Sequence, residues 1–256
     1  MVSYLAKFVI FTDLDGTLLD ANTYSPDAAK IALARVQALG WPIIFCSAKT
    51  AAEQAPIRAA LNVTDTYIVE NGSAIYFQDE EPLVLGLRAA EIHARLARIR
   101  TSLGLAFRGF HEASTAEVAA VTGLSLAAAR LAQQREFSAT IFTPFTPEDL
   151  ARFIDACAAE GLRAPSGGRF YTVTGQGADK GVAVRQVMRR YSGYISVGIG
   201  DSPNDAPLLR AVQRPYLVQR PDGTWHDLDV PHMVRVSAIG PIGWSQVITE
   251  LLAEHA

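Results

Sequence analysis

Two carboxylates separated by one residue, Asp13 and Asp15, directly follow an apolar segment near the N-terminus. That segment, residues 8–12 (FVIFT), predicts a buried strand that ends at the acidic pair. Residues two apart in a strand point to the same side, and two like charges there repel each other unless a cation lies between them. Such oxygen ligands favour Mg²⁺. One carboxylate could also act as a nucleophile and the other could transfer protons, although an Asp-Gly turn closing a strand is an alternative.

Two polar residues elsewhere are suited to binding a phosphoryl group. Ser47 follows the apolar run 42–46, where its hydroxyl and nearby backbone N–H groups can hold an anionic oxygen. Lys180 begins a predicted helix, where its charge can neutralise both a phosphate and a neighbouring nucleophile. Taken alone, Ser47 also fits a helix cap and Lys180 a solvated side chain.

A second acidic group, Asp201 and Asp205 with Asn204 between them, follows the predicted strand 194–199. Taken alone, these acids could stabilise the start of the next helix. All four groups nevertheless follow predicted strands or begin predicted helices. Their combination therefore indicates phosphoryl transfer rather than four separate structural roles.

Alternating strand and helix patterns predict an α/β fold with a doubly wound, Rossmann-like parallel sheet. Ligands of such sheets bind at the carboxyl ends of the strands, where Asp13, Ser47 and Asn71 are expected. Strands are expected at 8–12, 42–46, 67–69, 194–199 and near 233–236. Helices are expected at 26–39, 50–61, 182–190, 206–212 and 243–252. The first of these helices is expected to bury one side formed by Ala28, Ile31, Ala32, Val36 and Leu39.

The regular alternation stops after a predicted hairpin in residues 73–85 and resumes near Lys180. We therefore expect a catalytic core formed by residues 1–83 and 175–256, with an inserted α+β cap domain at 84–174. Within the insertion, helices are expected at 89–103, 126–134 and 147–160, and strands at 138–142 and 170–174.

The composition is that of a globular protein without a polyanionic partner. The 256 residues are 49% hydrophobic and 19% charged, with a net charge of −3. Neither a nucleic-acid partner nor a membrane partner is expected, and we expect a cytoplasmic protein. Cys46 and Cys157 are expected to be buried free thiols. The oligomeric state cannot be predicted.

The chain resembles the haloacid dehalogenase superfamily of phosphohydrolases through DLDGT, Ser47, Lys180 and GDSPND. This resemblance spans essentially the whole chain. It implies that Asp13 is the nucleophile and Asp15 the general acid and base. It also implies a Mg²⁺ cofactor held by the Asp13 carboxylate, the Asp15 backbone carbonyl and Asp201. The implied supporting residues are Asn204 and Asp205 for the metal, with Ser47 and Lys180 for the phosphoryl group.

Shorter strings resemble the mannosyl-3-phosphoglycerate phosphatase family: CSAKT at 46–50, VENGSAI at 69–75, REF at 135–137 and GGRF at 167–170. That family forms mannosylglycerate, a compatible solute, and the resemblance implies hydrolysis through an aspartyl-phosphate intermediate. The partner would be a small phosphorylated sugar-glycerate. Arginine suits its carboxylate, and glycine amides allow close approach. The implied substrate-binding residues are Lys49, Asn71, Arg135, Gly167, Gly168 and Arg169.

Three alternative functions remain open from the sequence. The substrate could be glucosyl-3-phosphoglycerate, which differs in the sugar. A phosphomannomutase-like enzyme would return the phosphate to a sugar instead of releasing it. A non-catalytic sugar-phosphate binding protein is the third alternative, against which the complete set of acidic residues and Lys180 argues.

Overall fold

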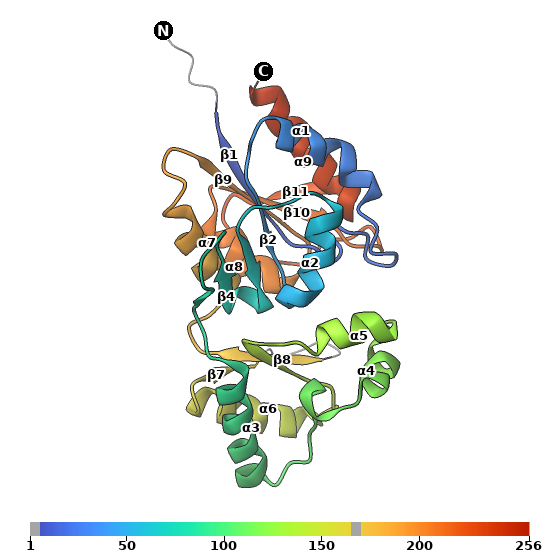
Figure 1. The fold of residues 1–256 in the computed structure, drawn as a ribbon, viewed down its shortest axis with the longest axis vertical. Coiled ribbons are helices and arrows are strands. Elements are labelled where there is room, and N and C mark those ends of the chain that lie inside the picture. Colours follow the sequence, from blue (N-terminus) through green and yellow to red (C-terminus); the bar gives the residue numbers. More distant parts are fainter. Residues whose placement is uncertain (1–5, 165–169, 256) are drawn as a thin grey trace.

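The computed structural model describes residues 6–164 and 170–255. Its large sheet has eight strands, in the order β11-β10-β9-β1-β2-β3-β4-β5 (Figure 1). They are β1 (Phe8–Thr12), β2 (Ile43–Cys46), β3 (Tyr67–Val69), β4 (Ala74–Tyr76), β5 (Leu83–Val84), β9 (Ile195–Gly200), β10 (Arg214–Gln219) and β11 (Val234–Ile239). The strands from β11 to β3 pair in parallel, and β4 and β5 form the antiparallel hairpin predicted. The predicted α/β fold class is confirmed.

Side chains of β1 alternate between two buried cores, as a strand covered on both faces requires. Phe8 and Ile10 point into one core, and Val9 and Phe11 into the other. Helices α1 (Lys30–Ala38) and α9 (Gly240–His255) pack on the first face. Helices α7 (Lys180–Met188) and α8 (Ala206–Ala211) cover the second, and α2 (Ala51–Ala60) connects β2 to β3.

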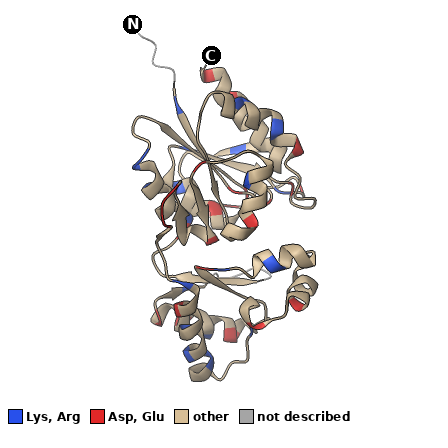
Figure 2. Ribbon diagram, in the orientation of Figure 1, with Lys and Arg blue, Asp and Glu red and all other residues tan. Residues whose placement is uncertain are grey.

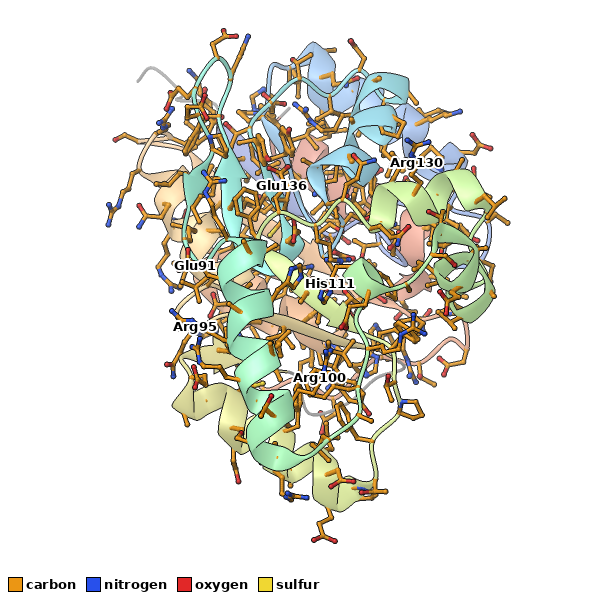
Figure 3. All side chains as sticks on the ribbon, turned by 60° about the horizontal axis from the view of Figure 1, so that its bottom comes forward. Glu91, Arg95, Arg100, His111, Arg130 and Glu136 are labelled. Carbon is orange, nitrogen blue, oxygen red and sulfur yellow. The ribbon has the colours of Figure 1, made fainter. Side chains whose placement is uncertain are left out.

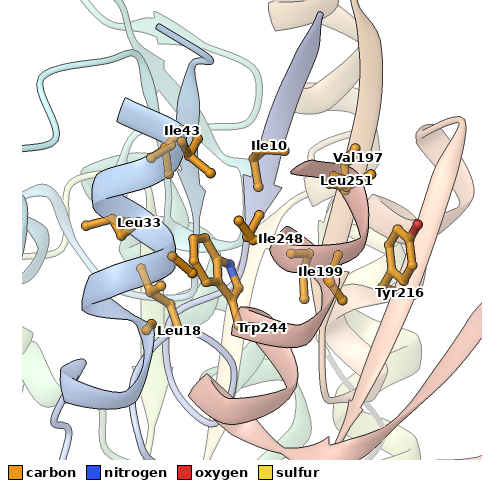
Figure 4. Packing of buried hydrophobic residues seen from close by; sticks show 14 of the residues in the cluster. Ile10, Leu18, Leu33, Ile43, Val197, Ile199, Tyr216, Trp244, Ile248 and Leu251 are labelled. Carbon is orange, nitrogen blue, oxygen red and sulfur yellow. The ribbon is translucent and has the colours of Figure 1, made fainter. Parts of the chain in front are cut away.

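Trp244 of α9 is the largest of the fully buried side chains and lies at the centre of the first core (Figure 4). It packs with Ile248 of the same helix and with Ile10 and Ile199 from two neighbouring strands. Burying an aromatic side chain of this size stabilises the fold by roughly 2–3 kcal/mol. The core therefore fixes β1 and β9, whose ends carry Asp13 and Asp201.

A smaller sheet, in the order β6-β8-β7, lies below the large one (Figure 1). Its strands are β6 (Ser138–Ile141), β7 (Leu162–Arg163) and β8 (Tyr171–Gly175), all paired antiparallel. With α3 (Ala89–Leu103), the 3-10 helix Phe110–Glu112, α4 (Thr115–Thr122), α5 (Leu126–Ala132) and α6 (Pro147–Ala159), they form what we call the small unit. The remaining elements form the large unit.

Arginines along α3 attach that helix to the rest of the small unit. Figure 3 shows Arg95 and Arg100 along its length. Arg95 donates to the backbone carbonyl of Glu160 at 2.5 Å, and Arg100 forms an ion pair with Glu112 at 2.7 Å. Lysines, arginines and acidic residues are intermixed over both units (Figure 2).

The structure corrects four details of the sequence analysis. The predicted buried side of the first helix is right for Ala32 and Val36 and wrong for three residues, because Ala28 is exposed, Ile31 is 81% exposed and Leu39 is 41% exposed. Contact with α9 also buries Ala29 and Leu33, which were not predicted. Helix α4 was not predicted, since it has only eight residues and buries only Val118. Strands β7 and β10 were also not predicted.

Among the described residues, no single helix is long and apolar enough to span a membrane. Only α4 and α5 together satisfy that criterion of length and composition, and they are bent by 102° at the break between them. Both cysteines are buried and free, as predicted.

Candidate active site

Asp13 and Lys180 meet at the point where the strand order of the large sheet reverses. β1 has β2 on one side and β9 on the other, so the loops after these strands diverge and leave room for a ligand. Lys180 Nζ donates to Oδ1 of Asp13 at 2.6 Å and to Oδ1 of Asp205 at 2.7 Å. The side chain of Lys180 is 0% exposed and that of Asp13 is 7% exposed. A buried cation is thus held between two acids.

Asp205 is fixed by the backbone at the end of β9. Its Oδ2 accepts N–H groups of Asp201 and Ser202, both at 3.1 Å, at the 3-10 helix Pro203–Asp205. These bonds turn its other oxygen toward Lys180. Asp205 therefore orients the lysine, a role beyond the metal support that the sequence resemblance implied.

Asp201 faces the loop that follows Asp13. The Thr17 hydroxyl donates to Oδ1 of Asp201 at 3.2 Å, a contact that the sequence analysis missed. Gly16 has φ +78°, and a Cβ there would lie 2.7 Å from Oδ2 of Asp201. Only glycine satisfies both the conformation and the close approach.

The acids Asp13, Asp201 and Asp205 offer oxygen atoms that all lie within 4.8 Å of one another. Burial raises the pKa of Asp13 well above its ordinary value, although Lys180 lowers it. Burial and the charge of Asp205 raise the pKa of Asp201 to about 7. When all three acids are ionised, they carry more negative charge than Lys180 neutralises, and their hard oxygen donors fit a divalent cation such as Mg²⁺.

Asp15 does not share the cation of Asp13. Its Oδ2 lies 2.9 Å from Nζ of Lys49, and its side chain is 45% exposed. Lys49, predicted to contact substrate, therefore contacts the predicted proton carrier. Burial lowers the pKa of Lys49, but Asp15 and Glu53 outweigh that effect and raise it above its ordinary value. Asp13 and Asp15 thus stand in different electrostatic surroundings.

The loop after β2, which carries Ser47, is tied to the loop after β3. Ser47 is 2% exposed, and its carbonyl accepts the N–H of Asn71 at 3.0 Å. Asn71 has φ +60°, and its Oδ1 accepts from Nδ2 of Asn204 at 3.2 Å. The structure therefore places Ser47, Asn71 and Asn204 around the same end of the sheet as the acidic cluster.

Glu70 links this loop to the small unit and was not singled out from the sequence. Its carboxylate is 1% exposed. It accepts N–H groups of Glu136 and Phe137 at 2.9 and 3.2 Å, and the hydroxyl of Ser138 at 2.5 Å. Its own φ is +50°, an unfavourable value for a side-chain-bearing residue. A charged residue directly after an apolar strand was the signal for it, as it was for Asp13.

Arg135 reaches from the small unit to the large one. Its Nη1 donates to the carbonyl of Ala48 at 3.3 Å and to Oγ of Ser138 at 3.0 Å. The predicted contacts Gly167, Gly168 and Arg169 lie outside the described residues.

Comparison with known proteins agrees with this arrangement. A family model described as haloacid dehalogenase-like hydrolase matches residues 10–112. A relative from Methanococcoides burtonii is 33% identical over 97% of this chain and 98% of its own length. Another, from Persephonella marina, is 32% identical over 96% of this chain and 97% of its own. Both are named glucosyl-3-phosphoglycerate/mannosyl-3-phosphoglycerate phosphatase.

The fold also matches a solved structure of a phosphatase from Bacteroides thetaiotaomicron. The TM-score is 0.74 at 17% identity, covering 99% of this chain and 97% of the other. With relatives about one third identical over nearly the whole length, this chain belongs to the haloacid dehalogenase-like hydrolases and is a phosphoric monoester hydrolase of that family.

Proposed function

We propose that this enzyme hydrolyses mannosyl-3-phosphoglycerate, and also glucosyl-3-phosphoglycerate, to the sugar-glycerate and phosphate. The observation that carries the proposal is the buried contact of Asp13 with Lys180 beside two further acids, in a chain whose relatives are named for both substrates. The reaction would proceed through an aspartyl-phosphate on Asp13, as the separate surroundings of Asp13 and Asp15 support.

Asp13 and Asp201 would hold Mg²⁺ together with the backbone carbonyl of Asp15, supported by Asn204 and Asp205. When bound, the ion would offset negative charge on the phosphoryl oxygens and on the acids themselves. The raised pKa values of Asp13 and Asp201 mean that their ionised forms are unfavourable in this site, and the additional positive charge would stabilise them.

Asp13 would attack phosphorus in line, forming an O–P bond as the bond to the substrate oxygen breaks. Lys180 would offset the charge of the equatorial oxygens, and Ser47 would donate a hydrogen bond to one of them. Asp15 would protonate the departing glycerate oxygen. It would then take a proton from the water that attacks phosphorus, so that Asp13 is regenerated and inorganic phosphate leaves.

The small unit would act as the predicted cap domain, with boundaries near residues 84 and 174. Its contacts with Glu70 and Ala48 would hold it over the phosphate-binding loop, where it excludes bulk water and selects the leaving group.

A phosphate-release assay tests this function. Mannosyl-3-phosphoglycerate, its glucosyl analogue, mannose 6-phosphate and mannose 1-phosphate would be compared at equal concentration, with Mg²⁺ and with EDTA. We expect Mg²⁺-dependent release that is fastest with the two phosphoglycerate esters. Preference for a simple sugar phosphate would contradict the substrate assignment, and isomerised sugar phosphate without free phosphate would indicate a mutase.

A further inference from the structure

One face of the small sheet carries hydroxyl groups although it is largely buried. Ser138 pairs directly with Thr174, and Thr140 with Thr172. Directly paired residues of antiparallel strands point to the same face. Ser138, Thr140 and Thr174 are at most 5% exposed. Four hydroxyl side chains therefore share one covered face of the sheet.

The opposite face of the same sheet is apolar. Ala139, Ile141, Leu162 and Val173 belong to the core formed with α3 and α6. The hydroxyl face is consequently turned toward the large unit (Figure 1). Simple packing between two units would favour apolar side chains there, because buried hydroxyls without partners are costly.

A cavity of ≈ 80 Å³, partly open to solvent, lies between the hydroxyl face and the part of the large unit that carries Lys180 and Asn204. The small unit contributes Arg163, Thr172 and Thr174 to its wall, and the large unit contributes Lys180 and Asn204 among others. A molecule bound there can contact Asn204 of the large unit on one side and the hydroxyl face on the other.

Arg163 adds a cation at the edge of this face. It pairs with Thr174 across β7 and β8, and its side chain is 54% exposed. Its Nη1 lies 3.9 Å from Oδ2 of Asp179, beyond hydrogen-bond distance. Asp179 instead accepts the N–H of Val182 at 2.7 Å through Oδ1. The guanidinium of Arg163 thus lies near Asp179 and donates no hydrogen bond to any residue in the described part of the chain.

The hydroxyls of Thr140 and Thr172 also keep unused capacity. Their oxygens are 3.4 Å apart, longer than the usual distance between hydrogen-bonded hydroxyls. A ligand that offers several hydroxyl groups and one carboxylate matches this wall in chemistry.

We propose that this cavity binds the leaving group, with Arg163 contacting the glycerate carboxylate and Thr172 and Thr174 contacting sugar hydroxyls. This assignment rests on the proposed function, because it names the part of the substrate that each side chain recognises. An arginine fork suits a carboxylate, and a threonine hydroxyl can both donate and accept toward a sugar.

The test compares Arg163→Met, Thr172→Val and Thr174→Val with the wild-type enzyme on two substrates. Mannosyl-3-phosphoglycerate carries both recognised groups, whereas p-nitrophenyl phosphate carries neither. For the first substrate we expect kcat/KM to fall about 10- to 100-fold in Arg163→Met and about fivefold in each threonine variant. For the second we expect every variant to stay within about twofold of wild type, which also demonstrates correct folding.

Matched controls are Arg152→Met and Thr101→Val, which change the same residue types on the outer helices of the small unit. Both should keep wild-type kinetics with either substrate. A third ester, 3-phosphoglycerate, retains the carboxylate without the sugar. Arg163→Met should impair its hydrolysis, and Thr174→Val should leave it unchanged.

The outcomes separate this proposal from the proposed function. Suppose that the wild type hydrolyses mannosyl-3-phosphoglycerate. If the variants then lose activity equally with both substrates, or keep full activity with both, the cavity assignment is wrong and the proposed function stands. If the wild type hydrolyses p-nitrophenyl phosphate but not the sugar ester, the proposed function is wrong, and the ligand assigned to the cavity is rejected with it.

Discussion

Lys180 Nζ lies 2.6 Å from Oδ1 of Asp13, and both side chains are almost completely removed from solvent. Burial lowers the pKa of Lys180, but Asp13 and Asp205 outweigh it and raise the pKa above its ordinary value. The lysine therefore remains charged throughout the physiological range. Lys180 thus offsets the energetic cost of burying Asp13 and Asp205. In the proposed reaction the same cation would also face the phosphoryl oxygens.

Replacing Lys180 by Met should remove that compensation. Asp13 and Asp205 would remain buried without their cation, so we expect the free energy of unfolding to fall by about 3–5 kcal/mol. Urea denaturation measures this change. Lys30→Met, which alters an exposed lysine paired with Asp27, is the matched control and should have little effect. Equal stability of the two variants would contradict the role assigned to Lys180.

Asp15→Asn should slow both halves of the reaction, because the amide cannot carry the proton. We expect kcat with the sugar ester to fall by about 10²- to 10⁴-fold. The loss should be smaller for phosphoryl transfer from p-nitrophenyl phosphate, whose leaving group needs no proton. Pre-steady-state kinetics would resolve the two steps. The same loss in the first step for both substrates would argue against proton transfer by Asp15.

When no divalent cation is bound, the stability of the protein should depend on pH through Asp201. Its pKa is about 7 in the folded chain against an ordinary 3.8, so the folded state binds the proton more tightly. Stability from this group therefore decreases as pH rises from near 4 to 7. Above pH 7, Asp201→Asn should melt at a higher temperature than wild type, by about 2–4 °C per kcal/mol gained.

Adding Mg²⁺ supplies the complementary measurement. The ion should raise the melting temperature of wild type and leave that of Asp201→Asn nearly unchanged, because the variant lacks a charged ligand. Identical Mg²⁺ responses in a differential scanning experiment would exclude Asp201 as a ligand.

Glu70→Gln should weaken the connection between the two units. Both carboxylate oxygens accept hydrogen bonds, and an amide would turn an N–H₂ group toward one of these donors. We expect a loss of about 1–3 kcal/mol in unfolding free energy. Glu91→Gln, which changes an exposed glutamate on α3, is the control. Matching urea midpoints for both variants would show that Glu70 does not hold the units together.

The catalytic half of the molecule follows well from the sequence. Strands that end in Asp13, Ser47 and Asp201 are apolar runs with abrupt polar ends, and the order of parallel strands brings such ends together. The contact partner of each acid could not be predicted from the sequence. The pairing of Asp15 with Lys49, for example, depends on the course of two loops.

Other elements escaped prediction for identifiable reasons. β10 contains Pro215, which argues against a strand inside a sheet, although its neighbours Tyr216 to Val218 are buried. Helix α4 could have been found from Ser114 and Glu117, whose spacing forms a capping box. The roles of Arg163 and Glu70 depend on how the units dock, and local patterns do not encode that arrangement.

Phosphorylation of Asp13 during turnover can be detected directly. Asp15→Asn enzyme would be mixed with mannosyl-3-phosphoglycerate and Mg²⁺, quenched in acid, and examined by intact-protein mass spectrometry. Borohydride reduction would then convert a phosphorylated aspartate to homoserine and locate it in the sequence. We expect one phosphoryl group per chain, located at Asp13 and absent in a variant that also carries Asp13→Asn. Phosphate release by Asp13→Asn at the wild-type rate, or modification at another residue, would contradict this expectation.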